Sequence, residues 1–379
     1  MALTVYRAED VCVAVNDSKP SGFLYIENAS SGAIPVLQFK LSEIISFESQ
    51  FELRTLDSEG ILFFGDKEGE SNWFLLALRK CYLEIQFPND HSQTAITGGP
   101  VISDGGWKQI SIANLNSTII VTVIKEEVIK THQPVENGDV MGSGVLRIGI
   151  GGLFPNSSLK LTLNPPLDGC LRNWDWVRQD TPVLNRFIES SESQRCWKSV
   201  VPGSYFSGHG AAQFESHCIC NYSETENWSL TMELSLRPVA ANGVLLAVLD
   251  FRNNYTYRIP EQNDNFTYLC PVAKLTSWYF VIDLEAQQLI LANKQLVFKS
   301  LDDEIISNVA DDFEALQAVW DQPGTTVYLG GLPDGGPAAG NSYYHGCMRV
   351  KIQGNHVDVD TAKNKHSGIQ SHSCPADLQ

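Results

Sequence analysis

The sequence predicts an all-β protein made of two antiparallel sandwiches in tandem. Apolar residues occur in runs of four to eight, separated by glycine, proline, asparagine and aspartate, with no long helical period. A series of glycine, tryptophan and cysteine landmarks also recurs in both halves of the 379-residue chain. The first observation indicates strands, and the second indicates duplication of one β-rich domain.

The stretch 49–89 shows the strand pattern most clearly. Alternating apolar and polar residues open and close it, and two fully apolar runs lie between them. The expected elements are a strand at 51–55, a turn at 57–60, a strand at 61–64, a polar loop at 65–72, and strands at 73–78 and 83–87. Four strands in so short a stretch are typical of an antiparallel sandwich.

The landmarks of the repeat have nearly equal spacing. In order, they are Gly60, Trp107, Gly151-Gly152, Gly169-Cys170 and Cys196 in the first half, and Gly243, Trp278, Gly330-Gly331, Gly346-Cys347 and Cys374 in the second. The first glycine precedes the glycine pair by 91 residues in one half and by 87 in the other. We expect one disulfide per domain, Cys170–Cys196 and Cys347–Cys374, each worth about 3–4 kcal/mol.

The same landmarks divide the chain into segments. Residues 1–32 are polar and are expected to form a tail or edge segment, followed by a first domain at 33–196. The segment 197–210 carries proline and glycine and is expected to be a linker to a second domain at 211–375. The one helix-like passage, 311–320, is expected to be a short surface turn.

Five cysteines lie outside the two expected disulfides: Cys12, Cys81, Cys218, Cys220 and Cys270. An odd number cannot pair completely, so at least one is expected to be free or intermolecular. Cys218 and Cys220 follow His217, but this spacing does not match a zinc site, and no second pair lies nearby.

Charge and motifs exclude several classes of protein. The formal net charge of −17 disfavours binding to nucleic acid or to anionic membranes, since both are polyanions. No apolar run approaches the ~20 residues that span a bilayer, so no membrane insertion is expected. Hydrolase and metalloprotease motifs are also missing from the sequence. We therefore do not expect an enzyme.

Cysteines and glycosylation motifs predict a secreted glycoprotein. Nine cysteines are many for a cytosolic chain of this size. Eight Asn-x-Ser/Thr motifs are candidates for glycosylation: Asn16, Asn28, Asn116, Asn156, Asn221, Asn227, Asn254 and Asn265. The N-terminal residues do not form a visible signal peptide, which leaves open a removed signal or an alternative start.

Six segments carry a family resemblance. FELRTLDSEGILFFGD, NWFLLALR and LEIQ, followed by DGGWKQISI, LRIGIGGLFP and LDGCLR, resemble a laminin G-like domain. The resemblance covers about 33–375 as two domains in tandem and implies jelly-roll sandwiches. Such pairs form sex hormone-binding globulin and the C-terminal half of vitamin K-dependent protein S. Ser49, Trp73-Phe74, Asn89 and the ending HVDVDTAKNKHSGIQSHSCP are most similar to the sex hormone-binding globulin family.

The resemblance implies a steroid between the two sheets of the first domain. By position, Ser49 would bond the ring A oxygen, Asn89 would bond the 17-hydroxyl, and Phe74 would pack on the steroid face. This chain has Asn72 where the family has an aspartate. The asparagine accepts a hydrogen bond without charge assistance, so we expect that bond to be weaker by ~1 kcal/mol.

Steroid chemistry fits such a site on physical grounds. A steroid is a rigid apolar plate with a polar atom at each end, and burying about 400 Å² of it is worth about 10 kcal/mol, less the cost of association. Leu146 in the pocket wall and Met141 in a covering loop are further candidates. The plain alternative is that Ser49 and Asn89 are turn or capping residues and that Phe74 belongs to the core.

The resemblance also implies a calcium ion near Asp57 and Glu59, with a backbone carbonyl from Pro166. The alternative is a solvated acidic turn.

We therefore expect a secreted carrier of androgens or oestradiol that forms a homodimer through its first domain. A rival from another class is an interaction module for a cell-surface receptor or a matrix glycan. An inactive variant from an alternative start is a third possibility.

Overall fold

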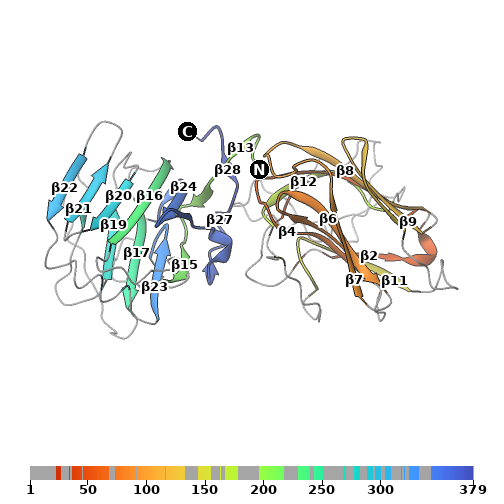
Figure 1. The fold of residues 1–379 in the computed structure, drawn as a ribbon, viewed down its shortest axis with the longest axis horizontal. Coiled ribbons are helices and arrows are strands. Elements are labelled where there is room, and N and C mark those ends of the chain that lie inside the picture. Colours follow the sequence, from red (N-terminus) through yellow and green to blue (C-terminus); the bar gives the residue numbers. More distant parts are fainter. Residues whose placement is uncertain are drawn as a thin grey trace, which may run out of the picture.

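A computed structural model shows two lobes, in which antiparallel β-strands make up most of the described residues (Figure 1). It describes residues 23–26, 34, 36–44, 46–67, 73–89, 92–115, 117–132, 144–154, 163, 167–177, 196–216, 229–239, 243–250, 268–269, 277–281, 288–292, 295–299, 304–308, 317, 320, 324–332 and 343–378. In these ranges, no helix has the length and apolar character needed to cross a membrane.

The first domain consists of two six-stranded antiparallel sheets. One has the order β1 (Phe23–Ile26), β12 (Gly169–Asp175), β3 (Glu48–Thr55), β8 (Lys108–Leu115), β9 (Thr118–Val123) and β10 (Glu126–His132). The other has the order β2 (Val36–Lys40), β11 (Val145–Ile150), β4 (Gly60–Lys67), β5 (Trp73–Arg79), β6 (Tyr82–Asn89) and β7 (Ser92–Gly98). A short 3-10 helix, η1 (Leu41–Glu43), follows β2.

Alternation along the strands builds the core between these two sheets. Phe51 and Leu53 of β3 are fully buried in it, and Leu76 and Leu78 of β5 face them from the other sheet. Aromatic rings fill its centre, where Phe51 lies 4.8 Å from Phe63 between ring centroids. Burying such side chains is the main source of stability in a sandwich.

The second domain also has two packed antiparallel sheets. One has the order β22 (Glu304–Asn308), β21 (Gln295–Lys299), β20 (Gln288–Ala292), β16 (Ser229–Pro238), β24 (His345–Ile352), β14 (Ser204–Ser207) and β27 (Ile369–Gln370), with β25 (Asn355–His356) on β24. The other has the order β18 (Tyr268–Leu269), β19 (Ser277–Val281), β17 (Val244–Asp250), β23 (Thr325–Leu329), β15 (Ala212–Glu215) and β26 (Asn364–Lys365). β13 (Val200–Val201) pairs with β28 (Cys374–Pro375), and η2 (Val359–Thr361) is a 3-10 turn.

Several boundaries differ from the sequence predictions. Residues 23–26 of the expected tail or edge segment form edge strand β1, which agrees with the edge alternative. The predicted linker contributes β13 and β14 to the second domain. The predicted loop at 65–72 is wrong at its start, because Gly65, Asp66 and Lys67 pair with β11 within β4. In the predicted surface turn at 311–320, the structure describes two residues. One of them, Trp320, is 2% exposed, so it belongs to the core.

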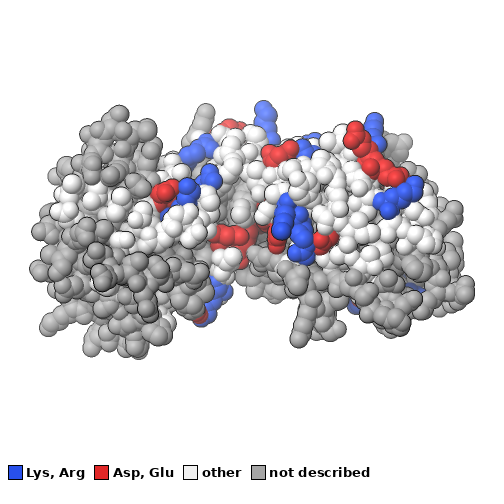
Figure 2. Space-filling view, viewed as in Figure 1, with Lys and Arg blue, Asp and Glu red and all other residues white. Residues whose placement is uncertain are grey.

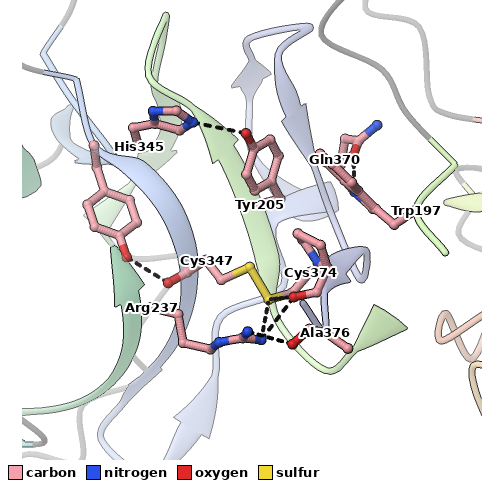
Figure 3. The surroundings of a disulfide bond; sticks show 10 residues. Trp197, Tyr205, Arg237, His345, Cys347, Gln370, Cys374 and Ala376 are labelled. Atoms are coloured by element: carbon pink, nitrogen blue, oxygen red, sulfur yellow. Dashed lines mark hydrogen bonds between the residues drawn. A yellow bond between two sulfur atoms is a disulfide. The ribbon is translucent and has the colours of Figure 1, made fainter. Parts of the chain in front are cut away.

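Both predicted disulfides are confirmed, and an arginine lies beside each. In the second domain, Arg237 is paired with Cys347 and donates to the carbonyls of Pro375 (2.9 Å) and Ala376 (2.7 Å) (Figure 3). In the first domain, Arg54 is paired with Cys170 and donates to the carbonyls of the two residues after Cys196, which are Trp197 and Lys198. Each arginine thus fixes, by hydrogen bonds, the backbone directly after the second cysteine of its disulfide.

Candidate functional site

The strand connections bring several predicted steroid contacts to one end of the first sandwich. A four-residue turn, 56–59, joins β3 to β4 at one end of the sandwich. The start of β3 and the end of β4 therefore lie at the other end. β5 returns from that opposite end and β6 runs back to it, which places Phe74 there together with the backbone of Asn89. Leu146, opposite Lys67, lies there too. We call this region, near Ser49, Phe74 and Leu146, the far end.

Ser49 presents a hydroxyl to the space between the sheets at the far end. It follows the same alternation as Phe51 and Leu53, whose side chains are buried in the core. Its Oγ accepts a hydrogen bond from the backbone N–H of Val177 at 3.0 Å. Because a serine hydroxyl is both an acceptor and a donor, the Ser49 O–H keeps its own proton to donate to a ligand oxygen.

Phe74 covers a glycine on the neighbouring strand. It is paired with Gly65, and a Cβ added to Gly65 would lie 2.1 Å from Cε1 of the phenyl ring. Only a glycine at this position lets the ring approach β4 so closely. Phe74 and Leu146 are both half-buried and both pack against the core of the first domain. They supply apolar surface close to the Ser49 hydroxyl.

Burial changes along the strands toward the far end. Leu76 and Leu78 are fully buried, whereas Phe74, on the same face of β5, is half-exposed. The far end is therefore more open to solvent than the centre of the sandwich. Apolar walls with one orienting hydroxyl suit a ligand that is mostly apolar and carries a polar atom at its tip.

Other predicted residues are not described by the structure. They are Asn72, Met141, Pro166, the eight glycosylation candidates Asn16, Asn28, Asn116, Asn156, Asn221, Asn227, Asn254 and Asn265, and the cysteines Cys12, Cys218, Cys220 and Cys270. Cys81, the one further cysteine in the described ranges, is a half-buried free thiol in the turn between β5 and β6.

Asp57 lies at the opposite end from Ser49, where the two domains meet. The ligand atoms of Asp57, Asp360 and His372 lie within 4.8 Å of one another, so the first domain contributes one residue and the second contributes two. Glu59 is not part of this group, although its backbone N–H donates to Asp57 at 3.3 Å. The predicted acidic site thus gains partners from the second domain.

Asp168 and Lys365 extend this group of side chains. Asp168 is fully buried beside Asp57, and its Oδ1 accepts a hydrogen bond from the Tyr25 hydroxyl at 3.1 Å. Lys365 donates to Oδ1 of Asp360 at 2.7 Å and lies 3.7 Å from Oδ2 of Asp168. We call Asp57, Asp168, Asp358, Asp360, Lys365 and His372 the joint cluster. Figure 2 shows acidic side chains at this junction between the lobes.

Burial and charge shift the pKa values in the joint cluster. Burial raises the pKa of Asp57 to about 6, against the opposing effect of the His372 charge. Burial and then the charge of Asp360 raise the pKa of Asp168 well above its usual range. Burial lowers the pKa of His372, but its hydrogen bond to Asp358 and the charges of three aspartates outweigh burial and raise it to about 9.

The joint cluster has an excess of acceptors. Four carboxylates face one ammonium and one imidazole, and Oδ2 of both Asp168 and Asp360 is buried without a hydrogen-bond donor. Buried carboxylate oxygens that accept no hydrogen bond favour a cation. The sequence reasoning missed Asp168, Asp358, Asp360, Lys365 and His372, because the contacts join distant parts of the chain. The Asp-Val-Asp motif at 358–360 was the available signal.

Comparisons with known proteins agree with this architecture. A family model described as the laminin G domain matches residues 53–181. The fold also resembles laminin G domains 4 and 5 of the mouse laminin α1 chain, with a TM-score of 0.60, 16% identity and 96% coverage of both chains. The class is therefore a tandem pair of laminin G-like domains.

Sequence relatives define the family more closely. The chain is 30% identical to sex hormone-binding globulin of Crocuta crocuta over 94% of its length and 89% of that protein. It therefore belongs to the laminin G-like family that includes sex hormone-binding globulin. It is also 31% identical to vitamin K-dependent protein S of Oryctolagus cuniculus, over 98% of this chain but 60% of that protein. Growth arrest-specific protein 6 of Mus musculus is 27% identical over 97% of this chain and 58% of that protein.

Proposed function

We propose that this protein is a carrier that binds one steroid between the sheets of its first domain, at the far end. The Ser49 hydroxyl carries the proposal, because it faces the intersheet space and has a proton to donate. Phe74 and Leu146 would pack on the steroid body. The relatives named sex hormone-binding globulin support a steroid as the ligand.

The apolar walls would supply most of the affinity, and the polar groups would orient the ligand. Burying a steroid gains about 25 cal/mol per Å² of apolar surface, of which association consumes part. Ser49 would bond the oxygen at one tip, and Asn72 and Asn89 would bond the hydroxyl at the other. Met141 would belong to the cover.

Binding of labelled androgen and oestradiol to Ser49→Ala tests this site. We expect at least a tenfold loss of affinity, because the ligand oxygen loses its donor. Ser111→Ala is the matched control, since Ser111 lies on the neighbouring strand and bonds Thr122 instead. Thermal unfolding separates lost binding from lost folding. Unchanged steroid affinity in a folded Ser49→Ala protein would reject the site.

Ligand preference is set in part by residue 72. Asn72→Asp should tighten 17-hydroxylated steroids about fivefold, since a charged acceptor adds roughly 1 kcal/mol. A 17-keto steroid should gain nothing, because it has no proton to donate there. Equal effects on the two ligands would remove residue 72 from the contact set.

We also propose that the joint cluster binds calcium, with Asp57 and Asp360 as ligands. The two buried carboxylate oxygens without donors support this proposal. Calcium should raise the melting temperature of the wild type but not of Asp360→Asn. Asp104→Asn, which alters an exposed acid, should keep the calcium response. A melting temperature that does not change with calcium in the wild type would contradict the proposal.

A second candidate function is an interaction module for a receptor or a matrix glycan. Its support is the similarity to protein S, to growth arrest-specific protein 6 and to laminin. A carrier takes up steroid stoichiometrically, whereas an interaction module binds a receptor ectodomain and ignores steroid. Secretion, glycosylation and a homodimer through the first domain belong to the carrier proposal. Light scattering of the purified, secreted protein tests the dimer.

A further inference from the structure

The second domain has a gap in one of its sheets beside strand β24. On one edge, β16 pairs with β24 from Gly346 to Ile352. On the other edge, β14 pairs as far as Met348, and β25 begins at Lys351. Between them, among the described residues, Arg349 and Val350 have no strand partner on this edge, although both pair with β16 on the other edge. The contact there is a hydrogen bond from Val357 N–H to the Val350 carbonyl, at 2.9 Å.

This gap opens a cavity of about 310 Å³ that reaches the core of the second domain. We call it the β24 notch. Its floor consists of core side chains, its sides come from the two chain segments flanking the gap, and its remaining wall comes from the first domain. The lining residues that matter are Phe206, Val350, Val357, Arg349, His356 and, from the first domain, Leu56.

The first-domain wall of the notch belongs to the turn that carries Asp57. Leu56 directly precedes Asp57, and Ser103, which also lines the notch, donates from Oγ to the Asp57 carbonyl. From the second domain, Asp358 and His372 line the notch and belong to the joint cluster. A molecule in the notch would therefore touch both domains where they meet.

Arg349 gives the rim of the notch a positive charge. Its Nη2 lies 3.2 Å from Nε2 of His356, and since guanidinium is always charged, the imidazole accepts this bond in its neutral form. Burial and the charges of Arg349 and Lys351 lower the pKa of His356, which agrees with a neutral ring. Lys351 is paired with Glu233, whereas Arg349 has no carboxylate partner among the described residues.

From this arrangement we propose that the β24 notch binds a small organic anion with an apolar body. The body would lie on Phe206, Val350 and Val357, and its carboxylate or sulfonate would meet the Arg349 guanidinium. The volume is at the low end of small-molecule sites, which start at about 300 Å³. A guanidinium suits such a group because it donates two parallel hydrogen bonds. This site is separate from the steroid site.

Two fluorescent probes of nearly the same shape test the proposal. One is 8-anilinonaphthalene-1-sulfonate, and the other is the neutral N-phenyl-1-naphthylamine. In the full chain, Arg349→Gln should weaken binding of the sulfonate about tenfold and change binding of the neutral probe less than twofold. Leu56→Ala should weaken both probes about threefold, because it removes apolar wall without changing charge.

Lys351→Gln is the matched control. It removes a cation two residues away on the same strand face, and it should leave the sulfonate affinity within twofold of wild type. Arg349 and Lys351 are both at least partly exposed, so both variants should fold, and thermal unfolding checks this. The proposal is overturned if Arg349→Gln leaves sulfonate binding unchanged, or if it weakens both probes equally.

Discussion

In both sandwiches an arginine lies beside the disulfide. The two differ in the residue that occupies one core-facing position of equivalent strands, β4 in the first domain and β17 in the second. Arg54 and Arg237 occupy equivalent places, each opposite the first cysteine of its disulfide. Gly65 pairs with Ile148 in the first domain, and its counterpart in the second domain is Val248, which pairs with Val327. Val248 is fully buried in the core, whereas Gly65 leaves its space to the Phe74 ring.

The arginine beside the disulfide binds a different segment of the chain in each domain. The carbonyls bound by Arg54 belong to the segment that leads into the second domain, so this arginine also fixes the junction between domains. The carbonyls bound by Arg237 belong to the C-terminal end of the chain (Figure 3). The comparison indicates that the first copy carries the anchor of the joint, which the second copy completes. Under the proposed function, the first copy also carries the ligand slot.

Removal of either disulfide should have the largest effect. The loops have sequence separations of 26 and 27, so the chain-entropy estimate gives about 3–4 kcal/mol for each. Cys170→Ala with Cys196→Ala, and Cys347→Ala with Cys374→Ala, should therefore lower the free energy of unfolding by similar amounts. Denaturant titration measures both. A difference above about 2 kcal/mol would show that the two closures are not equivalent.

Replacing the arginine beside the disulfide should cost more stability in the first domain than in the second. Arg54 is 3% exposed, so Arg54→Met leaves two carbonyls without a donor and should cost about 3 kcal/mol. Arg237 is less buried, and Arg237→Met should cost about half as much, since water replaces part of its bonding. Denaturant unfolding compares the two variants. An equal cost would refute the special role of Arg54.

A valine at position 65, as at the equivalent position 248 of the second domain, should close the proposed steroid slot. Gly65→Val should push the Phe74 ring off β4 and into the intersheet space, and should weaken steroid binding about tenfold. Overpacking should also cost about 1–3 kcal/mol of stability. Val248→Ala is the reverse change in the second domain and should leave steroid affinity unchanged. Retained affinity in Gly65→Val would show that Phe74 does not border the ligand.

The joint cluster should contribute less stability as pH rises. This is the smallest of the four effects predicted from the comparison of the two domains. The folded pKa of His372 is about 9, above its ordinary 6.5, so its stabilising charge is fully present below pH 6.5 and lost through pH 9. The folded pKa of Asp57, about 6, is above its ordinary 3.8, so ionising it also lowers stability between those values. With a chelator present, the melting temperature should fall from pH 6.5 to 9.5. His372→Gln should flatten that decline, and an unchanged slope would contradict the assignment.

Local sequence patterns predicted much of the fold. Alternation between 51 and 87 predicted strands β3 to β6, because one buried face imposes a period of two on a strand. The pattern ended β4 too early, at Phe64, because Asp66 and Lys67 are polar. Asp66 stays in the strand because it forms an ion pair with Arg147 of β11, which no local rule predicts.

The sequence by itself determined the duplication, both disulfides and the family resemblance that singled out Ser49 and Phe74. Equal spacing of glycines and cysteines is a property of the chain, and it needs no contact map. The Ser49 hydroxyl bond to Val177 and the Phe74 ring on Gly65 appeared with strand pairing.

Only the tertiary structure decided what surrounds Asp57. The sequence predicted an acidic turn within one domain, with Glu59 and Pro166 as neighbours. The structure instead brings Asp360 and His372 to it from the other domain. Sequence patterns report periods of a few residues, whereas the pKa of a buried carboxyl depends on charges that reach it only when two domains pack together.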